Sequence, residues 1–157
     1  MEELAQKAGV GKGTLYRRFG DRRALCRALL DDDERLMQER LMRGAGLPKN
    51  TAPLERLLAC VHLIATHVLT HADMLLEINA LSPNGPARYL HPVRQTYRYE
   101  IQRLLAARGH ARSDDLDFIA DAILALVEPE FLVWQKQTLG PRRLMTWLAT
   151  AVERLAA

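Results

Sequence analysis

The feature that most limits what this chain can fold into is a glycine-rich stretch near its N-terminus. Residues 9–19 read Gly-Val-Gly-Lys-Gly-Thr-Leu-Tyr-Arg-Arg-Phe, and they follow a segment, residues 1–8, whose apolar side chains share one helical face. Gly9 suits the left-handed conformation in which many helices end. In the helix that follows, Leu15 and Phe19 are four residues apart, so both can be buried while the opposite face stays polar. A helix, a glycine turn and a short two-faced helix together predict a helix-turn-helix.

The polar face of this second helix has the chemistry of DNA contacts. Arginine side chains can bind guanine edges or phosphates, and threonine and tyrosine hydroxyls suit phosphate oxygens. The free backbone N–H groups and the positive dipole end of the helix also favour a phosphate. We expect base contacts from Lys12, Gly13 and either Arg17 or Arg18, and phosphate contacts from Thr14, Tyr16 and Arg22. The full set of predicted DNA-binding residues is Gly11, Lys12, Gly13, Thr14, Tyr16, Arg17, Arg18 and Arg22.

Positive charge is concentrated in the same part of the chain. The chain has a formal net charge of +3. Residues 1–30 carry seven Lys and Arg against three Asp and Glu, a net of +4, so the remaining residues carry a net of −1. A basic cluster alone is usually a solvated surface. Because this one coincides with the helix-turn-helix, it indicates attraction to the phosphates of double-stranded DNA.

The residues of the motif also stand at the spacing of a family signature. They are Leu4-Ala5, Ala8-Gly9-Val10, Lys12-Gly13-Thr14-Leu15-Tyr16 and Phe19, with Leu25 six residues on. This run, which is specific because it combines many positions, resembles the DNA-binding region of TetR-family transcriptional regulators over residues 1–30. The resemblance implies an all-helical homodimer that binds a palindromic operator, acts in most cases as a repressor, and leaves the operator when a small-molecule effector binds its C-terminal part. It implies no cofactor.

The sequence departs from the family pattern in three places. Gly11 stands where serine is usual, a weaker but tolerated N-cap. Arg22 stands where lysine is common and keeps the positive charge. Family members carry a further helix before the motif, whereas this chain opens at Met1 within the first helix of the motif. We therefore expect Leu15 and Phe19 to lose part of their apolar cover and the DNA-binding region to be less stable.

The rest of the chain predicts helices and no strands. We expect an all-α protein with a helix-turn-helix region at residues 1–30 and a helical ligand-binding and dimerisation domain at residues 31–157. Apolar periodicity predicts helices over residues 22–43, 53–70, 73–81, 87–108 and 113–137, and a last helix from Pro141. In the first of these, Leu25, Ala28, Leu29, Leu36 and Leu41 form the expected buried stripe. Gly and Pro place loops at residues 44–53, 82–86 and 140–141, and Pro92 marks either a helix start or a kink.

The last two predicted helices have more apolar surface than a chain this short can hide. The first is apolar on two sides, and the second has an apolar stripe at helical spacing. Either both pack into an ordinary core or they form a dimer interface, which is where a TetR-like protein would place a four-helix contact. The candidate interface residues are Ile119, Ile123, Leu126, Leu144, Trp147, Leu148, Ala151 and Leu155.

A ligand pocket is predicted near Pro129, which should interrupt the predicted helix 113–137 beside two acids. Glu128 either faces the pocket and favours a cationic or hydrogen-bonding ligand, or lies on the surface. The candidate pocket residues are His67, Tyr97, Glu128, Phe131 and Trp134. His67 and His71 have metal-ligand spacing, but without an obvious third ligand we predict pocket or core histidines and no metal site. The run Asp31-Asp32-Asp33-Glu34 is expected to be a solvated helix face.

The sequence gives no support for several other classes of protein. Phosphate-binding glycine loops, a nucleophile elbow and Glu-x-x-His pairs are missing, so we expect no enzyme. Apolar runs are too short for a membrane span and no secretory signal is visible, and two isolated cysteines fit reduced core residues, so we expect a cytoplasmic protein. The alternative to a regulator is a helical ligand-binding dimer that no longer binds DNA. A metal- or cofactor-binding helical enzyme is the remotest possibility.

Overall fold

The computed structural model describes residues 2–80, 90–109 and 113–157, and this part of the chain is helical with no strand. The prediction of an all-α protein is confirmed for these residues. The predicted loop at residues 82–86 and the first residues of the predicted helix 87–108 lie outside them. The helices are α1 (Glu2–Lys7), α2 (Lys12–Phe19), α3 (Arg22–Met42), α4 (Pro53–Thr70), α5 (Ala72–Ala80), α6 (Pro92–Ala106), α7 (Ser113–Ala125), α8 (Pro129–Leu139) and α9 (Pro141–Leu155).

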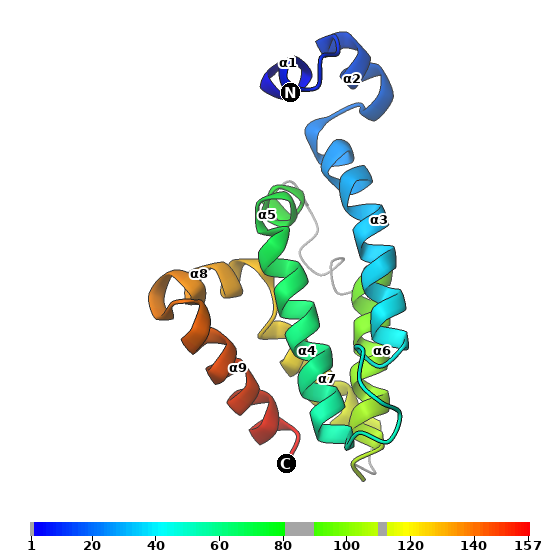
Figure 1. The fold of residues 1–157 in the computed structure, drawn as a ribbon, viewed down its shortest axis with the longest axis vertical. Coiled ribbons are helices and arrows are strands. Elements are labelled where there is room, and N and C mark those ends of the chain that lie inside the picture. The colour runs from blue at the N-terminus through cyan, green and yellow to red at the C-terminus, as the bar shows by residue number, and fades with distance from the viewer. Residues whose placement is uncertain (1, 81–89, 110–112) are drawn as a thin grey trace.

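The two short N-terminal helices lie at one end of the molecule and the C-terminus lies at the other (Figure 1). We call α1 and α2 the head and α4 to α9 the body. Helix α3 runs from the head along the body, and with 21 residues it is roughly 31 Å long. Helix α4 runs through the middle of the body, with α6 beside α3 and the pair α8 and α9 on the opposite side (Figure 1). The head is thus carried by one long helix that also packs against the body.

Local signals explain where α1 to α3 begin and end. Gly9 has a φ of 65°, the left-handed conformation predicted for it, and it separates α1 from α2. Asp21 caps α3, because its carboxylate accepts a hydrogen bond of 2.7 Å from the Ala24 backbone N–H. Such a cap contributes about 1 kcal/mol to helix stability. The Asp21 cap therefore stabilises the turn between α2 and α3.

The predicted buried stripe of α3 is partly wrong. Leu25 and Leu41 are buried as predicted, but Leu29 and Leu36 are 56% and 53% exposed, and Ala28 is exposed as well. The side chains that are buried are Leu25, Cys26, Leu30, Met37 and Leu41. Helix α3 packs against α4, α5 and α6, and the position of these neighbours selects the face that is buried.

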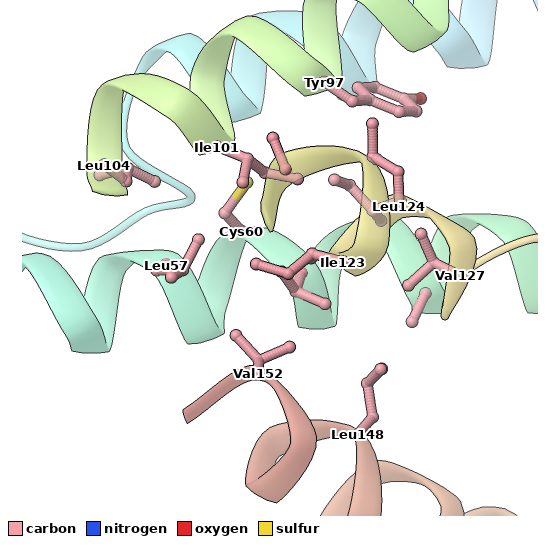
Figure 2. Close-up of a cluster of buried hydrophobic side chains, with 14 of the residues drawn as sticks. Leu57, Cys60, Tyr97, Ile101, Leu104, Ile123, Leu124, Val127, Leu148 and Val152 are labelled. Atoms are coloured by element: carbon pink, nitrogen blue, oxygen red, sulfur yellow. The ribbon is translucent and has the colours of Figure 1, made fainter. Parts of the chain in front are cut away.

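The core of the body forms around α4, whose Leu57, Cys60 and Ile64 are at most 2% exposed. Figure 2 shows side chains from α6, α7 and α9 converging on this helix. Both Cys26 and Cys60 are buried free thiols, as predicted. Burial raises the pKa of Cys60 to about 12, so its thiol stays protonated at neutral pH. Cys60 is therefore a small core residue.

Two predicted helix boundaries are corrected by proline. The predicted helix 113–137 is two helices, because α7 ends at Ala125 and α8 begins at Pro129. Glu128 has an extended backbone, with φ −62° and ψ 139°, as is usual before proline. Likewise α6 begins at Pro92, so this residue marks a helix start and no kink.

No single helix of the described residues is both long enough and apolar enough to cross a membrane. The bent pair α4 and α5, whose axes differ by 77°, meets the length and composition criteria only when the two helices are taken together.

Candidate nucleic-acid interface and interhelical cavity

The predicted DNA-binding residues all lie at the surface of the head or at its junction with α3. Gly11 precedes α2, Arg22 opens α3, and the remaining six lie within α2. All eight are exposed, and Tyr16 is 45% exposed. Gly11 has the extended backbone of an N-cap but makes no side-chain cap hydrogen bond, so the first N–H groups of α2 have no side-chain partner there. Exposed cations and free N–H groups at one end of the molecule form a surface suited to phosphates.

Three cations of this surface already have partners. Lys12 Nζ lies 2.7 Å from Glu2 Oε1, and this hydrogen bond holds the pKa of Lys12 above its ordinary value. Arg18 lies over the Phe19 ring, 5.7 Å from its centroid. Arg22 Nε lies 3.5 Å from Glu77 Oε1 on α5, which links the first turn of α3 to the body. A DNA phosphate that binds Lys12 or Arg22 must compete with these carboxylates.

The apolar side of α2 is poorly covered. Leu15 and Phe19 are half-buried, and α2 has no buried residue. On the neighbouring segments Leu4 and Val10 are 41% and 40% exposed. The expectation that Leu15 and Phe19 have incomplete apolar cover is confirmed. Their contribution to the stability of the head is therefore smaller than that of fully buried side chains.

A cavity of about 600 Å³ is lined in part by the N-terminal half of α3, the half that adjoins the head. It is bounded by α3, α4, α5, α6 and the junction of α7 with α8. Its lining among the described residues has apolar walls and ten polar or charged side chains. The polar set is Arg23, Arg27, Asp31, Glu34, His67, Asn79, His91, Arg94, Tyr97 and Glu128. The first four of these lie on α3, the helix that carries the head.

Three of the five predicted pocket residues line this cavity and two do not. His67, Tyr97 and Glu128 are among the lining residues, whereas Phe131 and Trp134 are absent from the lining and are 38% and 59% exposed. Phe131 and Trp134 are therefore corrected to surface residues. The reason is the break at Pro129, because α8 starts there in a new direction (Figure 1) and does not continue the line of α7.

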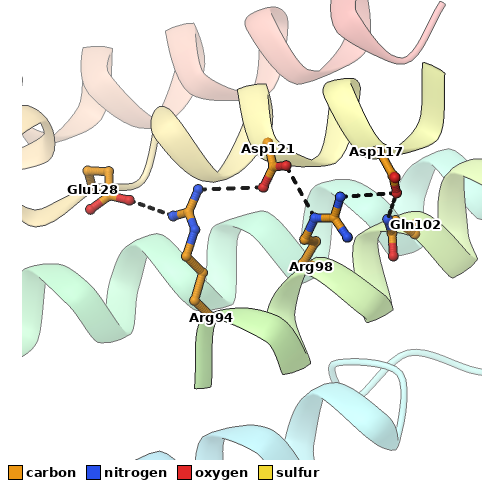
Figure 3. Close-up of polar contacts among 6 residues, drawn as sticks. All are labelled: Arg94, Arg98, Gln102, Asp117, Asp121 and Glu128. Carbon is orange, nitrogen blue, oxygen red and sulfur yellow. Dashed lines mark hydrogen bonds and ion pairs between the residues drawn. The ribbon is translucent and has the colours of Figure 1, made fainter. Parts of the chain in front are cut away.

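Glu128 does face the cavity, but its charge is already neutralised. Arg94 Nη1 lies 2.5 Å from Glu128 Oε1, and Arg94 Nη2 lies 3.8 Å from Asp121 Oδ1. Arg98 continues the row, with Asp121 at 3.2 Å and Asp117 at 3.0 Å (Figure 3). Gln102 donates a further hydrogen bond to Asp117. This row joins α6 to α7 and to the start of α8, and it fixes one wall of the cavity.

Among the described residues, Tyr97 Oη and His67 Nε2 are buried in the cavity wall without a hydrogen-bond partner. Burial is the main reason why the pKa of Tyr97 is raised, and the charge of Glu34 raises it further. Burial also lowers the pKa of His67, as does the neighbouring His71, so the imidazole is neutral at pH 7. Buried groups of this kind normally have partners, and both can accept hydrogen bonds from a ligand.

Sequence analysis missed the contribution of α3 to the cavity. Arg23, Arg27, Asp31 and Glu34 lie three or four residues apart, the spacing of one helical face, and this spacing was visible in the sequence. The prediction that Asp31 to Glu34 form a solvated face is right for the first three residues and wrong for Glu34, which is half-buried.

The histidine pair has no metal-site geometry in the described residues. The rings of His67 and His71 have centroids 4.7 Å apart, and His71 Nε2 lies 3.5 Å from Asp33 Oδ2. No group of three or more potential ligands comes together in the described part of the chain.

The candidate dimer residues divide into core and surface. Ile123, Leu144 and Leu148 are 0%, 4% and 7% exposed within one protomer, so their side chains have almost no surface to offer a second copy. These three are corrected to core residues. Ile119, Leu126, Ala151 and Leu155 are half-buried, and Trp147 is 52% exposed. Phe131 and Trp134 on α8 add exposed aromatic surface next to α9.

Comparison with known proteins bears on the head. Residues 1–29 match the family model described as bacterial regulatory proteins, tetR family. Searches of curated proteins and of solved structures returned no significant match. The matched residues are α1, α2 and the first turns of α3, which carry the exposed basic surface. Residues 1–29 are therefore similar to the DNA-binding region of this family, and this similarity supports a DNA-binding transcriptional regulator.

Proposed function

We propose that the protein is a homodimeric repressor whose two heads bind a palindromic operator and leave it when a small molecule fills the cavity. One observation carries this proposal: the helix that forms one wall of the cavity is the helix that carries the head. A ligand that displaces Arg23, Arg27 or Glu34 would also move α2, because the Asp21 cap joins α2 and α3 through a tight turn. A shift in the spacing of two heads weakens binding to paired half-sites.

In this proposal α2 lies in the major groove. The base edges are contacted by Lys12, Gly13 and either Arg17 or Arg18, and the phosphates by Thr14, Tyr16 and Arg22. Gly11 precedes α2 and lies next to the DNA backbone. The exposure of all these residues and the match of residues 1–29 support the assignment.

Two substitutions test the assignment. Arg17→Ala should reduce discrimination between operator and unrelated DNA by about 1–3 kcal/mol, because it removes a base contact. Tyr16→Phe should weaken all sequences alike, because it removes only a phosphate hydrogen bond. Fluorescence anisotropy with DNA upstream of the coding region, at two salt concentrations, measures both effects. Arg43→Ala is the matched control, since Arg43 is exposed but lies at the far end of α3. Unchanged operator affinity in both head variants would contradict the assignment.

The ion pair between Arg22 and Glu77 gives a second test. Because Glu77 competes with phosphate for Arg22, Glu77→Gln should tighten DNA binding by about two- to threefold at low salt, as expected for a partly exposed pair. Glu39→Gln is the control, since it removes a similar pair with Arg43 away from the head. Equal DNA affinity of the two variants in anisotropy titrations would show that Arg22 does not contact a phosphate.

A helical ligand-binding dimer that no longer binds DNA is the second candidate. The half-exposed Leu15 and Phe19 favour it, because a loosely packed α2 cannot hold its side chains in a fixed geometry. The same titration separates the two candidates. Salt-sensitive, sequence-specific binding supports the repressor, and binding that is absent at low salt supports the second candidate.

A further inference from the structure

The α3 wall of the cavity carries an acidic side chain that has no basic partner in the part of the chain that the structure describes. Glu34 is half-buried and lines the cavity together with Asp31, one turn earlier. None of the ion pairs among the described residues includes Glu34. Burial raises the pKa of Glu34, and the neighbouring charge of Asp31 raises it further. The protein thus holds a carboxylate in a place that disfavours its charge, and a cation beside it would relieve this cost.

The nearby arginines do not fill this role. Arg94 is held between Glu128 and Asp121, as Figure 3 shows, so its charge is already compensated. Arg27 lies at an exposed position closer to the head, where its charge lowers the pKa of His91. Neither arginine is among the groups that perturb Glu34.

Two acceptors without a hydrogen-bond partner among the described residues line the same cavity as Glu34. Tyr97 on α6 is only 7% exposed, its hydroxyl has no partner, and Glu34 is close enough to raise its pKa. His67 on α4 adds a buried Nε2 atom without a partner. A carboxylate, a phenol oxygen and a neutral imidazole from three helices can all accept hydrogen bonds. The apolar part of the wall includes Leu30, Ile64, Val68, Leu75, Ile78 and Leu124.

We propose that the cavity binds a small organic amine, with its protonated nitrogen held by Glu34 and Tyr97 and its apolar body lying against α4 and α5. The proposal rests on the proposed role of the cavity as the effector site and specifies the chemical class of the effector. A ligand carboxylate held by Arg23 and Arg27 is the competing arrangement, and the experiment below distinguishes the two.

The test is isothermal titration of the purified chain with three probes that share one ring system: naphthylethylamine, naphthylethanol and naphthylacetate. We expect the amine to bind at least about tenfold more tightly than the alcohol, as a charge-assisted hydrogen bond provides. Glu34→Gln should remove this preference and leave the affinity for the alcohol within about twofold. Asp32→Asn is the matched control, since Asp32 lies on the same helix but is exposed and outside the cavity, and this variant should keep the preference.

Three outcomes would overturn the proposal: no preference for the amine, including no binding of any probe; tightest binding of naphthylacetate; or a preference that persists in Glu34→Gln. Anisotropy with operator DNA is measured separately. Amine binding that depends on Glu34 but leaves DNA affinity unchanged would support this inference while contradicting the proposed release of the operator. DNA binding without any preference for the amine would contradict this inference and leave the proposed DNA binding supported.

Discussion

Replacing Ile123 with alanine is expected to lower the free energy of unfolding by about 2–5 kcal/mol, the usual cost of truncating a fully buried isoleucine. Ile123 is 0% exposed on α7 and belongs to the hydrophobic core, and Figure 2 draws it in one cluster with Leu57 and Val152. The cost arises because the surrounding helices cannot close completely over the lost methyl groups. Chemical denaturation followed by far-UV circular dichroism measures the change, provided that the slope of the transition stays the same.

The matched control for Ile123→Ala is Ile119→Ala, one turn earlier on the same helix. Ile119 is only half-buried, so its truncation should cost less than that of Ile123. The two substitutions remove the same atoms from the same helix, and the two side chains differ mainly in how far they are buried. Equal destabilisation by both, or no destabilisation by Ile123→Ala, would contradict the assignment of Ile123 to the core.

Replacing Trp147 with glutamate should dissociate the proposed homodimer. Trp147 is 52% exposed on α9, and Phe131 and Trp134 are exposed on α8, which packs against α9. Exposed tryptophans of this kind are the usual energetic centres of interfaces and contribute at least about 2 kcal/mol each, and a buried charge would add to the loss. We expect sedimentation velocity to show a shift from dimer to monomer. Operator affinity should fall as well, because a monomer binds only one half-site.

Leu36→Glu provides the control for this experiment. Leu36 is 53% exposed, almost as much as Trp147, but lies on the solvent face of α3. The Leu36→Glu substitution should leave the sedimentation coefficient unchanged. A dimer that persists in Trp147→Glu, or dissociation in both variants, would show that α8 and α9 do not form the contact.

The cavity shows which parts of a site the sequence could predict. His67 and Glu128 could be predicted as pocket residues because each is a polar residue in an apolar segment, and Tyr97 because it is an aromatic residue suited to a pocket wall; all three line the cavity. Glu34 was missed, because it follows three exposed aspartates and its half-buried position depends on α5 and α6, which pack against α3 from other parts of the chain. The neutralisation of Glu128 by Arg94 was missed for the same reason, since the two residues are 34 positions apart.

The helical class, the motif of the head and most helix boundaries can be predicted from the sequence, because they depend on interactions within a few residues. Gly9 separates α1 from α2 and Asp21 caps α3 through such local interactions, and the spacing of Leu15 and Phe19 predicts a two-faced helix. The buried face of each helix, the neutralised acid and the exposed aromatic rings become known only from the three-dimensional packing. Those outcomes depend on the packing of helices from distant parts of the chain, and no local pattern encodes it.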